Sequence, residues 1–128
     1  MTVDSSALVA IVLGEANHLD LIDRILEADH VRIGAPTLVE ASIVLSARVG
    51  RPMQDVLAEI LAELGVAIVP FGEAEWRLAH QAYLQFGRGR HPASLNFGDC
   101  LSYATARAAR DTLLFVGRDF EKTDIPPA

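Results

Sequence analysis

Segments typical of β-strands alternate with segments typical of α-helices along the whole chain. Apolar, strand-like runs occupy residues 1–3, 31–35, 66–69 and 113–116. Helix-like segments lie between and beyond them, at residues 5–13, 15–27, 36–49, 53–64, 73–86 and 97–110. Such alternation is typical of a parallel sheet that is covered by helices on both faces. We therefore predict a three-layer α/β/α fold with a central, mainly parallel sheet, in one domain spanning residues 1–128.

Composition narrows the class of protein further. Hydrophobic residues make up 51% of the 128 residues, which excludes a disordered chain. A net charge of −6 argues against a protein that coats nucleic acid by charge alone. No apolar block is long and uncharged enough to span a bilayer, and no secretion signal opens the chain. With Cys100 as its single cysteine, we expect a cytoplasmic protein without a disulfide and without a membrane partner.

Four acidic residues fall where a parallel sheet would bring them together. Asp4 and Asp119 follow the first and last predicted strands, and Glu40 and Asp99 lie in the first turns of two predicted helices. The carboxyl ends of parallel strands meet at one edge of the sheet, where open α/β sheets bind their ligands. We therefore expect the four carboxylates to converge at that edge.

Each acid also has a purely structural interpretation. Asp4 can cap the first helix, Asp99 can form a capping box with Asn96, Glu40 suits a first turn, and Asp119 suits a turn after glycine. The coincidence of four acids favours a functional cluster. At about 5 Å separation, each ionised pair would repel by about 3 kcal/mol at an effective dielectric constant near 20.

Such a cluster requires protonation or a bound cation. Oxygen ligands suit Mg²⁺, with Mn²⁺ as a substitute, whereas four scattered histidines and one cysteine argue against structural zinc.

Other segments are candidates for binding. Basic side chains near the acids, which would guide phosphate groups, are Arg88, Arg90, His91 and Arg118; a solvated charged loop is the alternative interpretation of the first three. Two apolar stripes at helical spacing can each be core, a homodimer face or a groove for a partner helix: Trp76, Ala79 and Tyr83, and Leu19, Ile22 and Leu26. For any single one of these residues, core is the expected location.

Four motifs together resemble a known family. They are Val3-Asp4-Ser5-Ser6-Ala7-Leu8, Pro36-Thr37-Leu38-Val39-Glu40, Leu95-Asn96-Phe97-Gly98-Asp99-Cys100 and Leu114-Phe115-Val116-Gly117-Arg118-Asp119-Phe120, followed by Thr123-Asp124-Ile125. In this order and spacing, the set closely resembles VapC-type toxins of the PIN-domain ribonuclease family, over nearly the whole chain.

The resemblance implies a Mg²⁺-dependent endoribonuclease toxin of a type II toxin–antitoxin system, which a VapB antitoxin inhibits and which forms a homodimer. It carries the family's catalytic and metal-binding acids onto Asp4, Glu40, Asp99 and Asp119, with Asp4 and Asp99 as the expected direct ligands. Ser6 and Asn96 are expected to support the site. One departure is Arg118, where relatives often have an acid or an amide; the neighbouring Asp119 is retained. Water would attack phosphorus directly, leaving 5′-phosphate and 3′-hydroxyl ends.

Two other classes stay open on the sequence alone. A catalytically silent PIN-like module that only binds protein would retain the same acids. A phosphoacceptor receiver domain also gathers acids around Mg²⁺, but it needs a lysine after a late strand, and Lys122 lies in a different context. The glycine-rich fingerprints of nucleotide-binding proteins do not occur.

Overall fold

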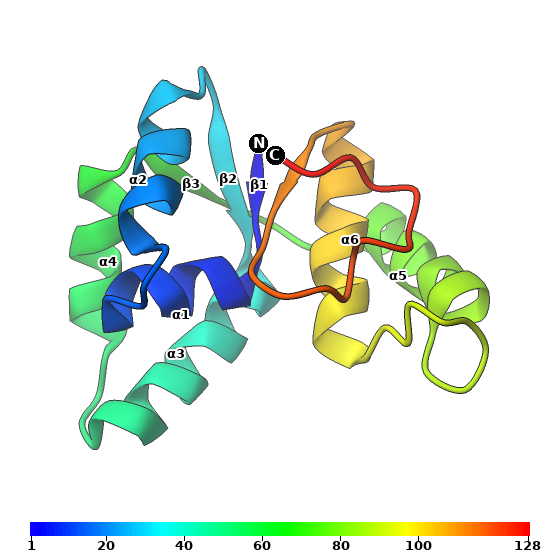
Figure 1. Ribbon diagram of the computed structural model, residues 1–128, viewed down its shortest axis with the longest axis horizontal. Coiled ribbons are helices and arrows are strands. Elements are labelled where there is room, and N and C mark those ends of the chain that lie inside the picture. The colour runs from blue at the N-terminus through cyan, green and yellow to red at the C-terminus, as the bar shows by residue number, and fades with distance from the viewer.

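The computed structural model describes residues 1–128 and contains four strands and six helices (Figure 1). The strands are β1 (Thr2–Val3), β2 (Val31–Gly34), β3 (Val66–Val69) and β4 (Leu113–Leu114). The helices are α1 (Ser5–Leu13), α2 (His18–Glu27), α3 (Ala35–Val49), α4 (Gln54–Glu63), α5 (Glu73–Phe86) and α6 (Phe97–Ala109). All strands pair in parallel, in the order β3-β2-β1-β4. The predicted fold class is confirmed.

Helices cover the two faces of this sheet unequally. One buried apolar cluster joins the sheet to α1, α2, α3 and α4, and it includes Leu8, Ile33 and Leu45. A second cluster joins α5, α6 and the segment after β4, and it includes Phe86 and Tyr103. Figure 1 shows the four helices on one side of the sheet and the two on the other. The carboxyl ends of β1 and β2, where α1 and α3 begin, lie between these two layers.

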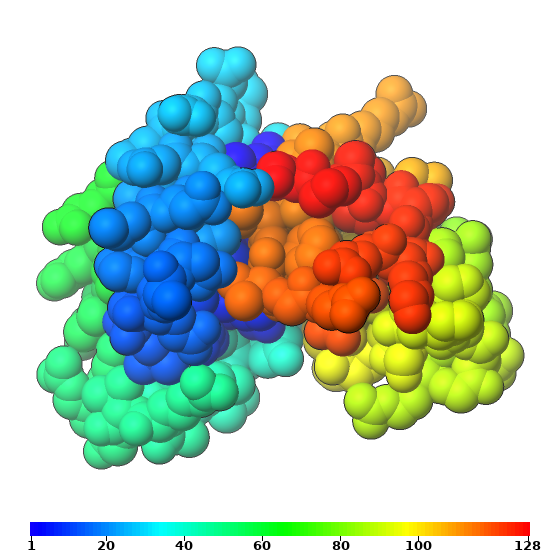
Figure 2. Space-filling model, viewed as in Figure 1, coloured from blue at the N-terminus to red at the C-terminus, as the bar shows by residue number.

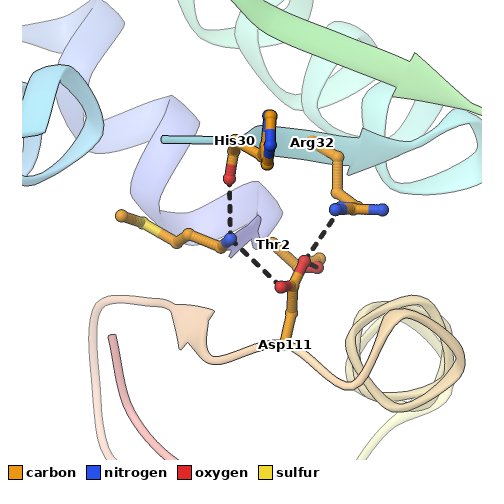
Figure 3. A network of polar contacts seen from close by, with 5 residues as sticks. Thr2, His30, Arg32 and Asp111 are labelled. Carbon is orange, nitrogen blue, oxygen red and sulfur yellow. Dashed lines mark hydrogen bonds and ion pairs between the residues drawn. The ribbon is translucent and has the colours of Figure 1, made fainter. Parts of the chain in front are cut away.

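The opposite, amino-terminal edge of the sheet is held by a polar network (Figure 3). Asp111, just before β4, lies 2.8 Å from Arg32 Nε and 3.3 Å from the amino group of Met1. It also accepts a hydrogen bond from the Thr2 hydroxyl, and the Met1 amino group donates to the carbonyl of His30. One carboxylate therefore ties β1, β2 and β4 together at the edge away from the predicted acidic cluster.

Several details differ from the sequence-based expectations. The strand expected at 113–116 pairs only at Leu113–Leu114, and α2 begins at His18 rather than Glu15. In α2 the buried side chains are Leu21 and Ile25, whereas Leu19 and Leu26 are 65% and 62% exposed. The expectation of core positions for Leu19 and Leu26 is therefore wrong, because the helix turns a neighbouring stripe toward α1.

No single helix is long and apolar enough to cross a membrane; only α1 and α2 taken as a pair meet that test by length and composition, and they are bent by 119°.

Candidate active site

Asp4 is the buried acid at the carboxyl end of β1. The residue is 4% exposed, and its side chain caps α1. Its Oδ2 atom accepts hydrogen bonds from the backbone N–H of Ser6, at 3.0 Å, and from the Ser6 hydroxyl. No hydrogen bond within the protein occupies the Oδ1 atom. The capping interpretation is therefore correct for one oxygen, and the second oxygen is available to a ligand.

Ser6 connects Asp4 to the segment that follows β4. While its hydroxyl donates to Asp4, its oxygen accepts a hydrogen bond of 3.0 Å from the N–H of Val116. Val116 leads through Gly117 to Asp119. Ser6 therefore fixes the orientation of one acid and the path of the chain toward another.

Asp99 stands in the first turn of α6 and forms the predicted capping box. Its Oδ2 atom accepts from the N–H of Asn96 at 2.8 Å, and its own N–H donates to Asn96 Oδ1 at 2.9 Å. The Oδ1 atom of Asp99 has no hydrogen-bond partner within the protein. Asn96 thus holds Asp99 in place without consuming both of its oxygens, as it would if it supported a ligand-binding carboxylate.

Glu40 approaches the same turn of α6 from α3. Its carboxylate lies so close to Gly98 that a Cβ atom on Gly98 would be 2.6 Å from both Oε1 and Oε2. The Oε2 atom is buried and has no hydrogen-bond partner. A buried carboxylate oxygen without a partner is costly, and a cation is one way to satisfy it.

Burial and the charges of neighbouring acids shift the pKa values of Asp99 and Glu40. Burial raises the pKa of Asp99 to about 6; the hydrogen bond from Asn96 opposes this shift, and the charges of Asp4, Asp119 and Glu40 add to it. Burial and then the charge of Asp4 raise the pKa of Glu40, and the hydroxyl of Ser5 offsets part of the shift. Asp119 itself is exposed. The structure therefore brings all four acids to one end of the sheet, with Asp119 at the rim.

The donor set fits a hard divalent cation by its chemistry. Asp4, Asp99 and Glu40 offer free carboxylate oxygens, one of them buried without a partner, and no histidine or cysteine is among them. No group of three or more acidic, histidine or cysteine side chains is close enough to hold a metal ion as it stands. A bound cation would offset the repulsion between these carboxylates.

The basic residues expected near phosphate groups differ in how far their side chains already contact other residues of the protein. Arg88 is exposed, and Arg90 lies over the ring of Tyr83 at 5.1 Å. His91 accepts a hydrogen bond at Nδ1 from the N–H of Ala93 and packs edge-on against Phe86, so its ring is used within the loop. Arg118 pairs with Glu121 at 3.0 Å. Among these four, Arg88 is the most available cation.

Two apolar cavities adjoin the acidic site and share the side chains of Phe97 and Leu101. The cavity between α5 and α6 measures about 520 Å³ and is lined by Trp76 and Tyr83. The cavity between α3 and α6 measures about 440 Å³ and reaches Glu40. Figure 2 shows the surface hollowed between α3 and the start of α6. Sequence periodicity suggested core positions for Trp76 and Tyr83, but they are 57% and 44% exposed.

Comparison with known proteins shows the family to which the chain belongs. The model of the PIN domain matches residues 1–126 of the chain. The chain therefore belongs to the PIN-domain family. The predicted resemblance to VapC-type toxins is confirmed by relatives within that family. Ribonuclease VapC36 of Mycobacterium tuberculosis is 41% identical over 126 residues, which cover 98% of this chain and 91% of the relative.

Two further comparisons agree. Ribonuclease VapC28 of the same organism is 41% identical over 129 residues, covering 100% of this chain and 97% of the relative. The crystal structure of Mycobacterium tuberculosis VapC20, described as a sarcin-ricin loop cleaving toxin, has a TM-score of 0.78 and covers 99% of this chain and 97% of its own. At 19% identity, that structure supports the fold alone.

A pH-dependent response to metal follows from the raised pKa of Asp99. The pKa of Asp99 in the folded, metal-free protein is about 6, above its ordinary value of 3.8. Protonation of Asp99 therefore stabilises the folded protein at low pH, and this stabilisation is lost as the pH rises from about 4 to about 6. A cation requires the deprotonated acid. We expect Mn²⁺ to raise Tm more at pH 7.5 than at pH 5.0, as measured by differential scanning fluorimetry. An equal rise at both pH values, or the same rise in Asp99→Asn, would contradict this prediction.

Proposed function

We propose that this chain is the toxin of a type II toxin–antitoxin system and that it hydrolyses RNA phosphodiester bonds in a divalent-metal-dependent reaction. The observation that carries the proposal is the meeting of Asp4, Glu40 and Asp99 at one end of the sheet, with the Oε2 atom of Glu40 buried and unpartnered. Relatives that are named ribonucleases and cover nearly the whole chain support the same reaction class. Such an activity is expected to act in the cytoplasm.

The chain's own residues have distinct roles in this proposal. Asp4 and Asp99 would ligate Mg²⁺ through the oxygens that their caps leave free, and Ser6 and Asn96 would hold those carboxylates in orientation. Glu40 or Asp119 would orient the attacking water. When bound, the metal would position the scissile phosphate, lower the pKa of a water and stabilise charge on the phosphoryl oxygens.

RNA has to approach an acidic pocket on a chain of net charge −6. Arg88 is the basic side chain that we expect to contact the phosphate backbone directly, with Arg90 beside it. Arg118 would contribute after leaving Glu121, and His91 would keep the loop in shape rather than touch RNA.

Two protein partners complete the proposal. A VapB-type antitoxin is proposed from the family, and its binding would block the acidic end. We further propose a homodimer through the face that contains Phe97, Trp76, Tyr83, Val39 and Ile43. Phe97 is 82% exposed and stands between the two apolar cavities, so one face carries both a protruding ring and hollows to receive one. A two-fold interface requires this kind of self-complementarity.

Cleavage of RNA by the purified chain tests the reaction. We expect cleavage in the presence of Mg²⁺ or Mn²⁺, loss of cleavage with EDTA, recovery when Mg²⁺ is restored, and products with 5′-phosphate ends. A protein that binds its antitoxin but cleaves no RNA with either metal would be the silent PIN-like module instead.

A further inference from the structure

Gly98 is a glycine inside a helix, where alanine is intrinsically favoured. It lies in the first turn of α6, is buried, and lacks the positive φ angle that would call for glycine. A Cβ atom there would meet Glu40 Oε1 and Oε2 at 2.6 Å and Glu40 Cδ at 2.8 Å, with no backbone atom among these nearest neighbours. The carboxylate of Glu40 therefore occupies the space that a side chain at position 98 would fill.

We infer that Gly98 is a positioning residue: its missing Cβ creates the seat that holds the Glu40 carboxylate against α6, one residue from Asp99. This inference deepens the proposed function and rests on it for its catalytic consequence. Ordinary contact begins near 3.4 Å, so a Cβ atom would displace the carboxylate by about 0.8 Å. Displacements of about 1 Å in a catalytic site can lower rates about 100-fold.

The seat also explains why Glu40 lies in the cluster at all. The first turn of a helix carries partial positive charge, which favours an anion there. Glu40 Oε2 has no hydrogen-bond partner, and both carboxylate oxygens lie against the bare backbone of Gly98, so this close contact helps to fix the position of the carboxylate beside the hydroxyl of Ser5. Because the Glu40 carboxylate lies at the end of a flexible side chain, a methyl group added at position 98 would move the carboxylate and leave the fold of α6 intact.

The test is Gly98→Ala, with Gly72→Ala as the matched control. A Cβ atom on Gly72, which caps α5, would approach nothing closer than Glu75 Oε2 at 3.5 Å. We expect Gly98→Ala to keep or raise the Tm, to lower kcat/KM for RNA cleavage 10- to 100-fold, and to weaken Mn²⁺ binding at least threefold by electron paramagnetic resonance titration. Gly72→Ala should stay within twofold of wild type in both assays.

A second background separates positioning from general damage. Glu40→Asp shortens the side chain and withdraws its carboxylate from α6, so adding Gly98→Ala there should cost less than threefold in kcat/KM. Cleavage and Mn²⁺ binding by Gly98→Ala within twofold of wild type would overturn the inference, and so would equal losses in both backgrounds.

The contact itself has a readout that needs no activity. In a Glu40→Ala background the added methyl group meets no carboxylate, so Gly98→Ala should raise the Tm by more than it does with Glu40 present. An equal change in Tm in both backgrounds would overturn the inference. If wild type neither cleaves RNA nor binds Mn²⁺, the proposed function fails, and this pair of Tm differences still decides whether Gly98 seats Glu40.

Discussion

Replacing Asp4 or Asp99 with asparagine should lower Mg²⁺-dependent RNA cleavage by at least about 100-fold while the protein stays folded. Each substitution removes a negative charge that a hard cation requires, and losses of this order are typical when charge stabilisation is removed from a phosphoryl-transfer site. Asparagine keeps an oxygen that can accept from Ser6 at position 4 or from the Asn96 N–H at position 99. It is also a good helix N-cap, so capping by residue 4 is retained.

Stability and a distant control distinguish lost chemistry from lost structure. The Tm of each variant without metal should equal or exceed that of wild type, because repulsion within the cluster is reduced. Asp23→Asn, at an exposed position in α2, should cleave RNA at the wild-type rate. Cleavage by Asp4→Asn or Asp99→Asn within threefold of wild type would remove these acids from the proposed site.

Phe97→Glu should convert a homodimer into a monomer. The ring is 82% exposed in the single chain, so it contributes little to the folded monomer. A charge in its place would have to lose its water in the proposed interface, which is costly without a partner. Sedimentation equilibrium should give twice 13.8 kDa for wild type and 13.8 kDa for the variant.

Two further variants locate the interface. Phe97→Leu keeps an apolar side chain and should stay dimeric, and Leu19→Glu changes a residue of similar exposure on α2 and should leave the mass unchanged. A monomeric wild type at 50 µM protein, or a dimer that survives Phe97→Glu but not Leu19→Glu, would contradict the proposed face.

Much of the fold was predictable because alternating apolar strands and capped helices are local patterns. Proline and glycine marked the ends of α3 and α4, and the order of strands and helices predicted a parallel sheet. Exposure was less predictable. Periodicity identifies a stripe on a helix but not what covers it, so Leu19, Trp76 and Tyr83 were expected in the core and are exposed.

The site shows a similar division between local and long-range information. Capping and ligand binding are compatible for Asp4 and Asp99, because a carboxylate has two oxygens and each cap uses only one. The contact of Gly98 with Glu40 joins residues 58 positions apart in the chain. No local sequence pattern could have predicted it. The bond from Val116 to Ser6, across 110 positions, was equally invisible in the sequence.

Diffraction from crystals grown with Mn²⁺ tests most directly the claim that these acids form a divalent-cation site. Anomalous scattering identifies the ion independently of any activity. We expect an anomalous peak in contact with oxygens of Asp4 and Asp99 at the carboxyl end of β1, and no such peak in Asp4→Asn crystals grown in the same way. Peaks found only elsewhere on the molecule, or none at 10 mM Mn²⁺ and pH 7.5, would contradict the account.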